Sequence, residues 1–248
     1  MVGAYLDSSF GARYFVLIDG EFKDVGPLDT SPFAPPLVSR NVDGNKLARR
    51  VVGNYADGSG SHGFLLRNGI YTNIDAPWVD PLNLGTTAAG INPEGDIVGF
   101  YTTSSGIVQG FLLTQGSYVD MPTAVFGAQW SAINPAGNIL GEYFDSGGNI
   151  YGFLLKKGVL TDVVGSGAGQ VVPLGMNAQG DIVGTTFYST PSCGFLLSHG
   201  AVMTVDSLLP NSPCTFPYGI NEQGDIVGTY FDNVGSGMHG FLLKKNAE

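Results

Sequence analysis

Aromatic residues that stand among polar ones give this sequence its clearest capacity for ligand binding. Aromatic rings next to polar groups can hold the apolar face of a sugar or of another amphipathic molecule. The alternative is that Trp130 and Tyr218 only fill the interior of the fold. We predict that the following residues line a binding site: Trp78, Phe126, Gln129, Trp130, Phe216 and Tyr218.

Charged residues suggest two further kinds of site. Glu142 is the candidate general acid or base, because the equivalent residues elsewhere in the chain are not acidic. Arg40 and Arg50 belong to a basic group, with Lys46 and Arg49, that could hold an anionic ligand or an acidic partner. A solvated turn would explain the same basic residues.

The sequence predicts neither a metal site nor a cofactor. His62 and His239 occupy equivalent positions in different copies of a repeat, and His199 lies in a predicted turn, so their side chains should be far apart. Residues 58–63 fit the Gly-x-Gly-x-x-Gly pattern but lead into a predicted strand, whereas a dinucleotide site needs a helix there. We therefore interpret this segment as a hairpin loop.

The elements that must position these residues belong to a repeat. A Phe-Leu-Leu motif recurs at intervals of 42 to 49 residues, and a Val-Gly or Leu-Gly pair precedes each copy. A turn of the form Asn-x-x-Gly, as in residues 92–95, comes before that pair and is typical of a type I turn. The motif phenylalanines are Phe64, Phe111, Phe153, Phe195 and Phe241, with a degenerate copy at Phe15.

Each copy of the repeat is predicted to form four antiparallel strands. In one copy the first strand ends at residue 91, and the other three strands cover residues 96–101, 110–113 and 117–120. The third strand is apolar throughout, which indicates that both of its faces are covered, as in stacked propeller blades. We expect a single all-β domain over residues 1–248: a β-propeller of six four-stranded blades with incomplete first and last members, or alternatively five blades and an extra hairpin.

Acidic residues recur near the end of the fourth strand. Turn hydrogen bonding explains such recurrence better than a set of calcium sites does. The aspartates assigned to this position are Asp24, Asp75, Asp120, Asp162 and Asp206.

The motif Gly-Ile-Asn-x-x-Gly-Asp-Ile-Val-Gly-x-Tyr, followed by residues 61–64 or 238–241, resembles the bacterial extracellular repeats named for a His-Ala-Phe signature. The resemblance covers nearly the whole chain, although Gly replaces Ala and only two copies keep the histidine. It implies a propeller-like, exported protein and says little about activity.

Charge and cysteine content narrow the partners and the location. The net charge of −10 argues against nucleic acid and anionic membrane surfaces as partners. A disulfide between Cys193 and Cys214 would favour an oxidising compartment. The first residues do not form a secretory signal, so an exported protein would have lost its leader; we expect a secreted or periplasmic location.

Three functions stay open at this point. The favoured one is an exported module that binds a carbohydrate or another small amphipathic ligand at an aromatic channel mouth. The second is an enzyme, a hydrolase, lyase or cyclase, with its site in the same pocket. The third is a protein interaction scaffold. The fold alone does not distinguish them, because propellers host many functions.

Overall fold

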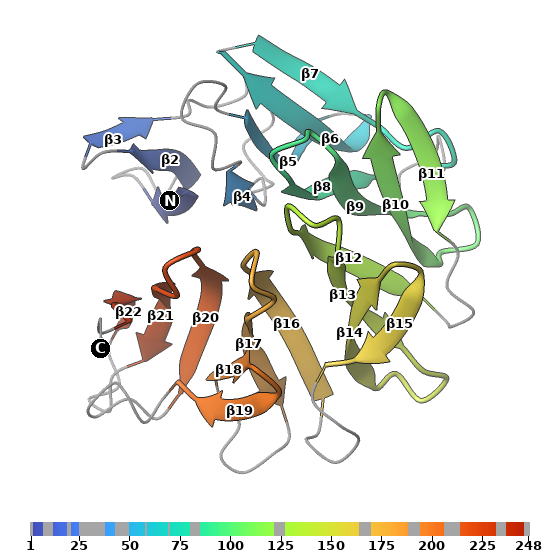
Figure 1. Ribbon diagram of the computed structural model, residues 1–248. Helices are drawn as coiled ribbons and strands as arrows, with labels where there is room; N and C mark the ends of the chain where they lie inside the picture. The colour runs from blue at the N-terminus through green and yellow to red at the C-terminus, as the bar shows by residue number, and fades with distance from the viewer. Residues whose placement is uncertain are drawn as a thin grey trace. The chain divides into compact units, whose positions relative to one another are not determined.

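The computed structural model describes residues 2–6, 12–18, 21–24, 38–42, 50–57, 59–68, 70–79, 85–121, 127–163, 170–187, 194–205, 214–231 and 237–245. Every regular element in these ranges is a β-strand (Figure 1). The same residues contain no helix that is long and apolar enough to cross a membrane. Contacts divide the chain into two compact units, residues 1–130 and 131–248.

The first unit contains three antiparallel sheets whose strands follow each other in chain order. Figure 1 shows the strands of each sheet side by side. The first sheet contains β1 (Val2–Leu6), β2 (Ala12–Ile18) and β3 (Glu21–Asp24). The second contains β4 (Val38–Val42), β5 (Arg50–Asp57), β6 (Gly60–Arg67) and β7 (Ile70–Ile74), and the third β8 (Thr86–Ile91), β9 (Ile97–Thr102), β10 (Val108–Thr114) and β11 (Ser117–Met121).

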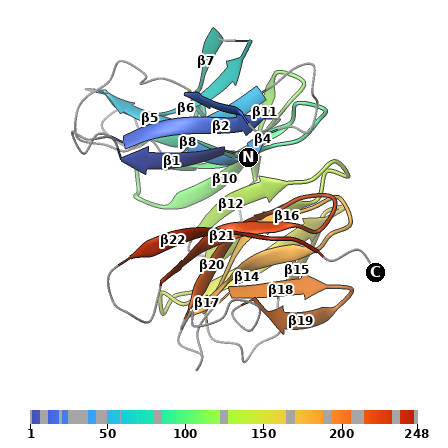
Figure 2. The same ribbon diagram turned by 90° about the vertical axis from the view of Figure 1, so that its left-hand side faces the viewer.

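The second unit begins within β12 and repeats this pattern. One sheet contains β12 (Ala128–Ile133), β13 (Ile139–Phe144), β14 (Ile150–Lys156) and β15 (Val159–Asp162). The next contains β16 (Gln170–Met176), β17 (Ile182–Phe187), β18 (Gly194–Ser198) and β19 (Ala201–Thr204), of which β18 and β19 form the hairpin visible in Figure 2. The last contains β20 (Thr215–Ile220), β21 (Ile226–Phe231) and β22 (Met238–Leu243).

The predicted repeat of four strands is confirmed. Within the described ranges four sheets have four strands, while the first and the last have three. In the same ranges the first sheet has no strand before β1 and the last has none after β22, as the sequence predicted for the incomplete copies.

The two recurring turns fold as their residues dictate. Asn92 accepts a backbone hydrogen bond from Gly95 (3.1 Å), and its side-chain Oδ1 accepts another from Asp96 (2.8 Å). The equivalent turns at 134–137, 177–180 and 221–224 make the same backbone bond. Between the third and fourth strands, Gln115 and Gly116 both have positive φ (49° and 77°), which matches a two-residue hairpin turn.

Glycine in the third strand allows the next sheet to approach closely. A Cβ at Gly152 would lie 2.8 Å from Pro173 Cδ, and one at Gly194 would lie 2.8 Å from Pro217 Cδ. In the first unit a Cβ at Gly110 would overlap the Trp130 indole. The glycine before the motif phenylalanine is therefore required at 110, 152 and 194 by packing between neighbouring sheets.

A second glycine, in the Val-Gly pair, accommodates the motif phenylalanine. A Cβ at Gly99 would lie 2.8 Å from the Phe111 ring, and one at Gly184 would lie 2.9 Å from the Phe195 ring. The first strand shifts register opposite this glycine, between Ala88 and Gly90 in the third sheet. The resulting bulge recurs between Pro173 and Gly175 and between Pro217 and Gly219.

The cores lie on both faces of a sheet, as the apolar third strand predicted. In β18, Phe195 and Leu197 pack into one buried cluster with Ile182. The intervening Leu196 packs into a different cluster, with Val205 and Ile226. Each side of this sheet is therefore covered by its own apolar layer.

Candidate functional site

A hydrogen bond between the second and fourth strands recurs from sheet to sheet. The Tyr101 hydroxyl lies 3.0 Å from Asp120 Oδ1, and the Tyr143 hydroxyl lies 3.2 Å from Asp162 Oδ1. In the second sheet Asn73 takes the place of the aspartate, with its Oδ1 3.0 Å from the Tyr55 hydroxyl. Because it recurs, this pair belongs to the common architecture of the sheets.

The strand register corrects the predicted equivalence of the aspartates. Asp120 pairs with Phe111, Asp162 with Phe153, and Asp24 with Phe15. In the second sheet the residue paired with Phe64 is Asn73, and in the fifth sheet the residue paired with Phe195 is Thr204. Asp75 and Asp206 therefore each lie two positions further along the chain. The sequence-based alignment equated these aspartates because they share a residue type. Equivalent positions in a sheet are instead defined by backbone pairing between the strands.

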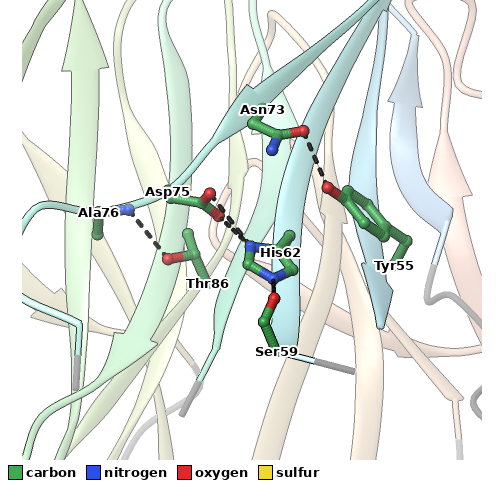
Figure 3. Close-up of polar contacts among 7 residues, drawn as sticks. All are labelled: Tyr55, Ser59, His62, Asn73, Asp75, Ala76 and Thr86. Carbon is green, nitrogen blue, oxygen red and sulfur yellow. Dashed lines mark hydrogen bonds and ion pairs between the residues drawn. The ribbon is translucent and has the colours of Figure 1, made fainter. Parts of the chain in front are cut away.

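Asp75 instead belongs to a hydrogen-bonded chain of three side chains (Figure 3). Ser59 Oγ lies 2.9 Å from His62 Nε2. On the other side of the ring, His62 Nδ1 lies 3.1 Å from each carboxylate oxygen of Asp75. The His62 and Asp75 side chains are 22% and 35% exposed, and Ser59 is exposed, so the chain lies at the surface.

Local structure explains why these three residues meet. Asp57 pairs with Gly60 at the end of the β5–β6 hairpin, which places Ser59 in the turn and His62 in β6. The Tyr55 ring stacks on His62 with centroids 5.3 Å apart. Asp75 directly follows β7, and the next residue is held by a hydrogen bond from Ala76 N to Thr86 Oγ1 (3.0 Å) (Figure 3).

An exposed tryptophan lies three residues after Asp75. Trp78 is 39% exposed. Its ring centroid lies 5.7 Å from that of Tyr101 and 6.4 Å from that of Tyr118, the second contact being edge-to-face at 85°. Two tyrosines of the third sheet therefore support an indole that still faces solvent.

Polar groups interact with the two tyrosines that support this indole. Gln109 Oε1 lies 2.8 Å from the Tyr101 hydroxyl, which also contacts Asp120. Burial, together with Asp120, raises the pKa of Tyr101. Burial also raises the pKa of Tyr118 to about 12, and the negative charge of Asp75 adds to this shift. Both phenols are protonated at neutral pH. The buried Tyr101 hydroxyl donates to Gln109 and Asp120, whereas the half-buried Tyr118 hydroxyl can donate to a ligand. We call Trp78, Tyr101, Tyr118, Gln109, Asp75 and Asp120 the Trp78 cluster.

The remaining predicted ligand residues occupy varied positions. Trp130 is 1% exposed and packs on Gly110, while Gln129 is half-buried in β12; both belong to the first unit. Phe216 and Tyr218, in the second unit, are also half-buried. Phe216 packs edge-to-face on Phe231, with centroids 5.9 Å apart. Phe126 lies outside the described residues.

The charged candidates have positions that the sequence did not specify. Glu142 is half-buried in β13 and pairs with Gly152 of β14. Arg50, at the start of β5, donates a hydrogen bond to the carbonyl of Pro93 in the next turn. Arg50 thus links two sheets of the first unit. The backbone of Arg40 lies in β4, but its side chain is outside the described part, as are Lys46 and Arg49.

The predicted disulfide stays a prediction. Cys214 is half-buried directly before β20, whereas Cys193 lies outside the described residues. Within the described ranges, no three His, Cys, Asp or Glu side chains are grouped so as to hold a metal ion.

No protein-family model matches the chain, and no curated protein matches its sequence. Solved structures do match. The putative TolB of Agrobacterium tumefaciens is 14% identical, with a TM-score of 0.62 over 90% of this chain and 80% of that one. TolB of Acinetobacter baumannii is 12% identical, with a TM-score of 0.53 over 79% of this chain. The match spans about half of that structure, 49% of its chain.

A lectin from Aleuria aurantia is also similar. A point mutant of this lectin in complex with α-methyl-L-fucoside is 10% identical, with a TM-score of 0.56 over 97% of this chain and 90% of that one. Another structure of this lectin is described as a six-bladed β-propeller with a novel mode of fucose recognition. At such low identity these matches show the fold alone: the chain is an all-β β-propeller. The resemblance to His-Ala-Phe repeats is not confirmed by any family match.

Proposed function

We propose that this protein binds a carbohydrate and that the Trp78 cluster is the binding site. The observation that carries the proposal is the partly exposed Trp78 indole, supported by the rings of Tyr101 and Tyr118. Such support fixes the indole before a ligand arrives, which lowers the entropy cost of binding.

The chemistry around the indole suits a sugar. An aromatic face packs against the C–H groups of a pyranose, while its hydroxyls need both donors and acceptors nearby. Asp75 and Asp120 supply acceptors, while the Tyr118 hydroxyl and the side-chain amide N–H of Gln109, whose Oε1 accepts from Tyr101, supply donors. The net charge of −10 favours a neutral sugar over an anionic one.

The fold comparison supports the same class of ligand. A β-propeller lectin of similar fold was solved with α-methyl-L-fucoside, which makes this neutral glycoside a suitable first probe. Of the two predicted tryptophans, Trp130 is buried, so this proposal rests on Trp78. The ligand contacts predicted at Phe126, Gln129, Phe216, Tyr218, Arg40 and Arg50 stay predictions.

Titration calorimetry on the full chain with α-methyl-L-fucoside, followed by a panel of neutral glycans, tests this proposal. Trp78→Ala should lower the affinity for the bound glycan at least tenfold, which corresponds to about 1.4 kcal/mol. Phe187→Ala is the matched control, because Phe187 is also an exposed aromatic residue, at 38%. Unchanged affinity in Trp78→Ala would refute the assignment of the site.

Two finer features belong to the same proposal. The six sheets of the described residues correspond to six blades, a number that the fungal lectin also has. The protein works in a secreted or periplasmic compartment, where Cys193 and Cys214 form a disulfide. Mass spectrometry after alkylation tests the bond, since two modified thiols in the unreduced protein would exclude it.

A further inference from the structure

From the geometry of Ser59, His62 and Asp75 we infer a second activity: Ser59 is a nucleophile, and this site hydrolyses small neutral carboxylic esters. The two ring nitrogens of His62 have different partners. Nε2 lies 2.9 Å from Ser59 Oγ, and Nδ1 lies 3.1 Å from the Asp75 carboxylate (Figure 3). We call these three residues the Ser59 site.

This arrangement determines where the protons lie. A carboxylate only accepts hydrogen bonds, so the Nδ1 proton of His62 points to Asp75 and the neutral ring presents the Nε2 lone pair to Ser59. A histidine held in that tautomer can remove the hydroxyl proton, and the carboxylate then stabilises the imidazolium. The stacked Tyr55 ring restricts the imidazole further.

The Ser59 site combines residue types that other copies carry separately. The last copy has Ser236 and His239 at the positions of Ser59 and His62, and the fifth copy has Asp206 at the position of Asp75. The remaining copies carry Arg13, Gln109, Tyr151 and Cys193 at the histidine position. In the given sequence, serine, histidine and aspartate occur together at these three positions in the second copy alone, so it is the combination that departs from the repeat.

The reaction needs no other reagent than water. Ser59 Oγ attacks the ester carbonyl carbon while its proton moves to His62 Nε2. The tetrahedral intermediate collapses, the C–O bond to the alcohol breaks, and His62 returns the proton to the departing oxygen. Water, activated by the same nitrogen, then releases the acid and regenerates Ser59.

The position of the site defines the substrate class. Ser59 is exposed at a hairpin turn, so an ester on a larger molecule could reach it without entering a deep pocket. The net charge of −10 disfavours anionic acyl groups. A short neutral acyl group such as acetyl fits both conditions.

Labelling of the full-length wild type with a fluorophosphonate, followed by peptide mapping, tests the nucleophile without any substitution. The expected result is one modified residue per chain, Ser59. Absence of labelling, or labelling of another residue only, would overturn the inference.

Hydrolysis of p-nitrophenyl acetate tests the roles of the three residues. Ser59→Ala and His62→Gln should each lower the rate at least about 100-fold, since general base catalysis contributes at least that factor. Asp75→Asn should also lower it, while Ser105→Ala should stay within twofold. Ser105 lies in the equivalent hairpin of the next sheet, 2.9 Å from Thr103 Oγ1. Near-wild-type rates in folded Ser59→Ala protein would contradict the inference.

Discussion

At the residue scale, the two tryptophans show how neighbours decide the role of a side chain. Both were predicted as ligand contacts from residue type. Trp130 is 1% exposed because Gly110 lets its strand approach, whereas Trp78 is 39% exposed on two tyrosines. The sequence identified the aromatic residues, but exposure depends on contacts between strands that are distant in sequence.

Replacing Trp130 should therefore affect folding more than binding. Trp130→Ala leaves a cavity in a packed region and should lower the free energy of unfolding by about 3–5 kcal/mol. Trp78→Ala should cost about 1 kcal/mol or less, because the side chain is partly solvated. Urea unfolding of both variants measures the difference, and equal losses would contradict these assignments.

Tyr118 gives a prediction for alkaline pH. Its pKa is raised to about 12 by burial and by Asp75, whereas an unfolded tyrosine titrates near 10. The stability contributed by the protonated phenol is thus fully present below pH 10 and lost as the pH rises from 10 to 12. Ultraviolet titration of tyrosinate should show a late-ionising group that Tyr118→Phe removes. A variant with the wild-type titration curve would refute the shift.

At the element scale, the recurring glycines were visible in the sequence, but their cause was not. The repeat revealed a glycine before every complete Phe-Leu-Leu motif. Only the structure shows that Gly110, Gly152 and Gly194 face the first strand of the next sheet. A pattern can reveal a constraint without naming the group that imposes it.

Two glycines at the same repeat position give a matched test of this packing. Gly110→Ala should destabilise the protein by about 1–3 kcal/mol, because the methyl group would overlap Trp130. Gly240→Ala should change stability by about 0.5 kcal/mol or less, since among the described residues its Cβ would meet only Gly228 O, at 4.0 Å. Thermal or urea unfolding provides the measurement, and similar effects in both variants would argue against the packing constraint.

The Ser59 site was not predicted from the sequence, because it depends on how two strands pair. His62 was interpreted as a repeat position and Asp75 as a turn residue. Their meeting depends on the register of β6 with β7, in which Phe64 pairs with Asn73. The absence of histidine from most copies was the available signal, but sequence counting could not supply the two-residue offset of Asp75.

At the scale of the whole molecule, the fold was more predictable than the function. A period of 42 to 49 residues with four strand segments per copy leads to antiparallel sheets, and the described residues form them. A binding site needs features that depart from the repeat. The sites proposed around Trp78 and Ser59 depend on side-chain geometry, which periodicity does not encode.

The predicted single domain can be tested by calorimetry. One domain should unfold in one cooperative transition, with equal calorimetric and van't Hoff enthalpies. Two resolved transitions would instead indicate that residues 1–130 and 131–248 unfold as separate units.

Tryptophan fluorescence offers the most direct test of carbohydrate binding at Trp78. The chain contains two tryptophans, and only Trp78 is exposed enough for acrylamide to quench. A glycan that binds in calorimetry should protect the quenchable component, and Trp78→Phe should remove that component from the start. Binding that leaves the quenching of Trp78 unchanged would contradict the account.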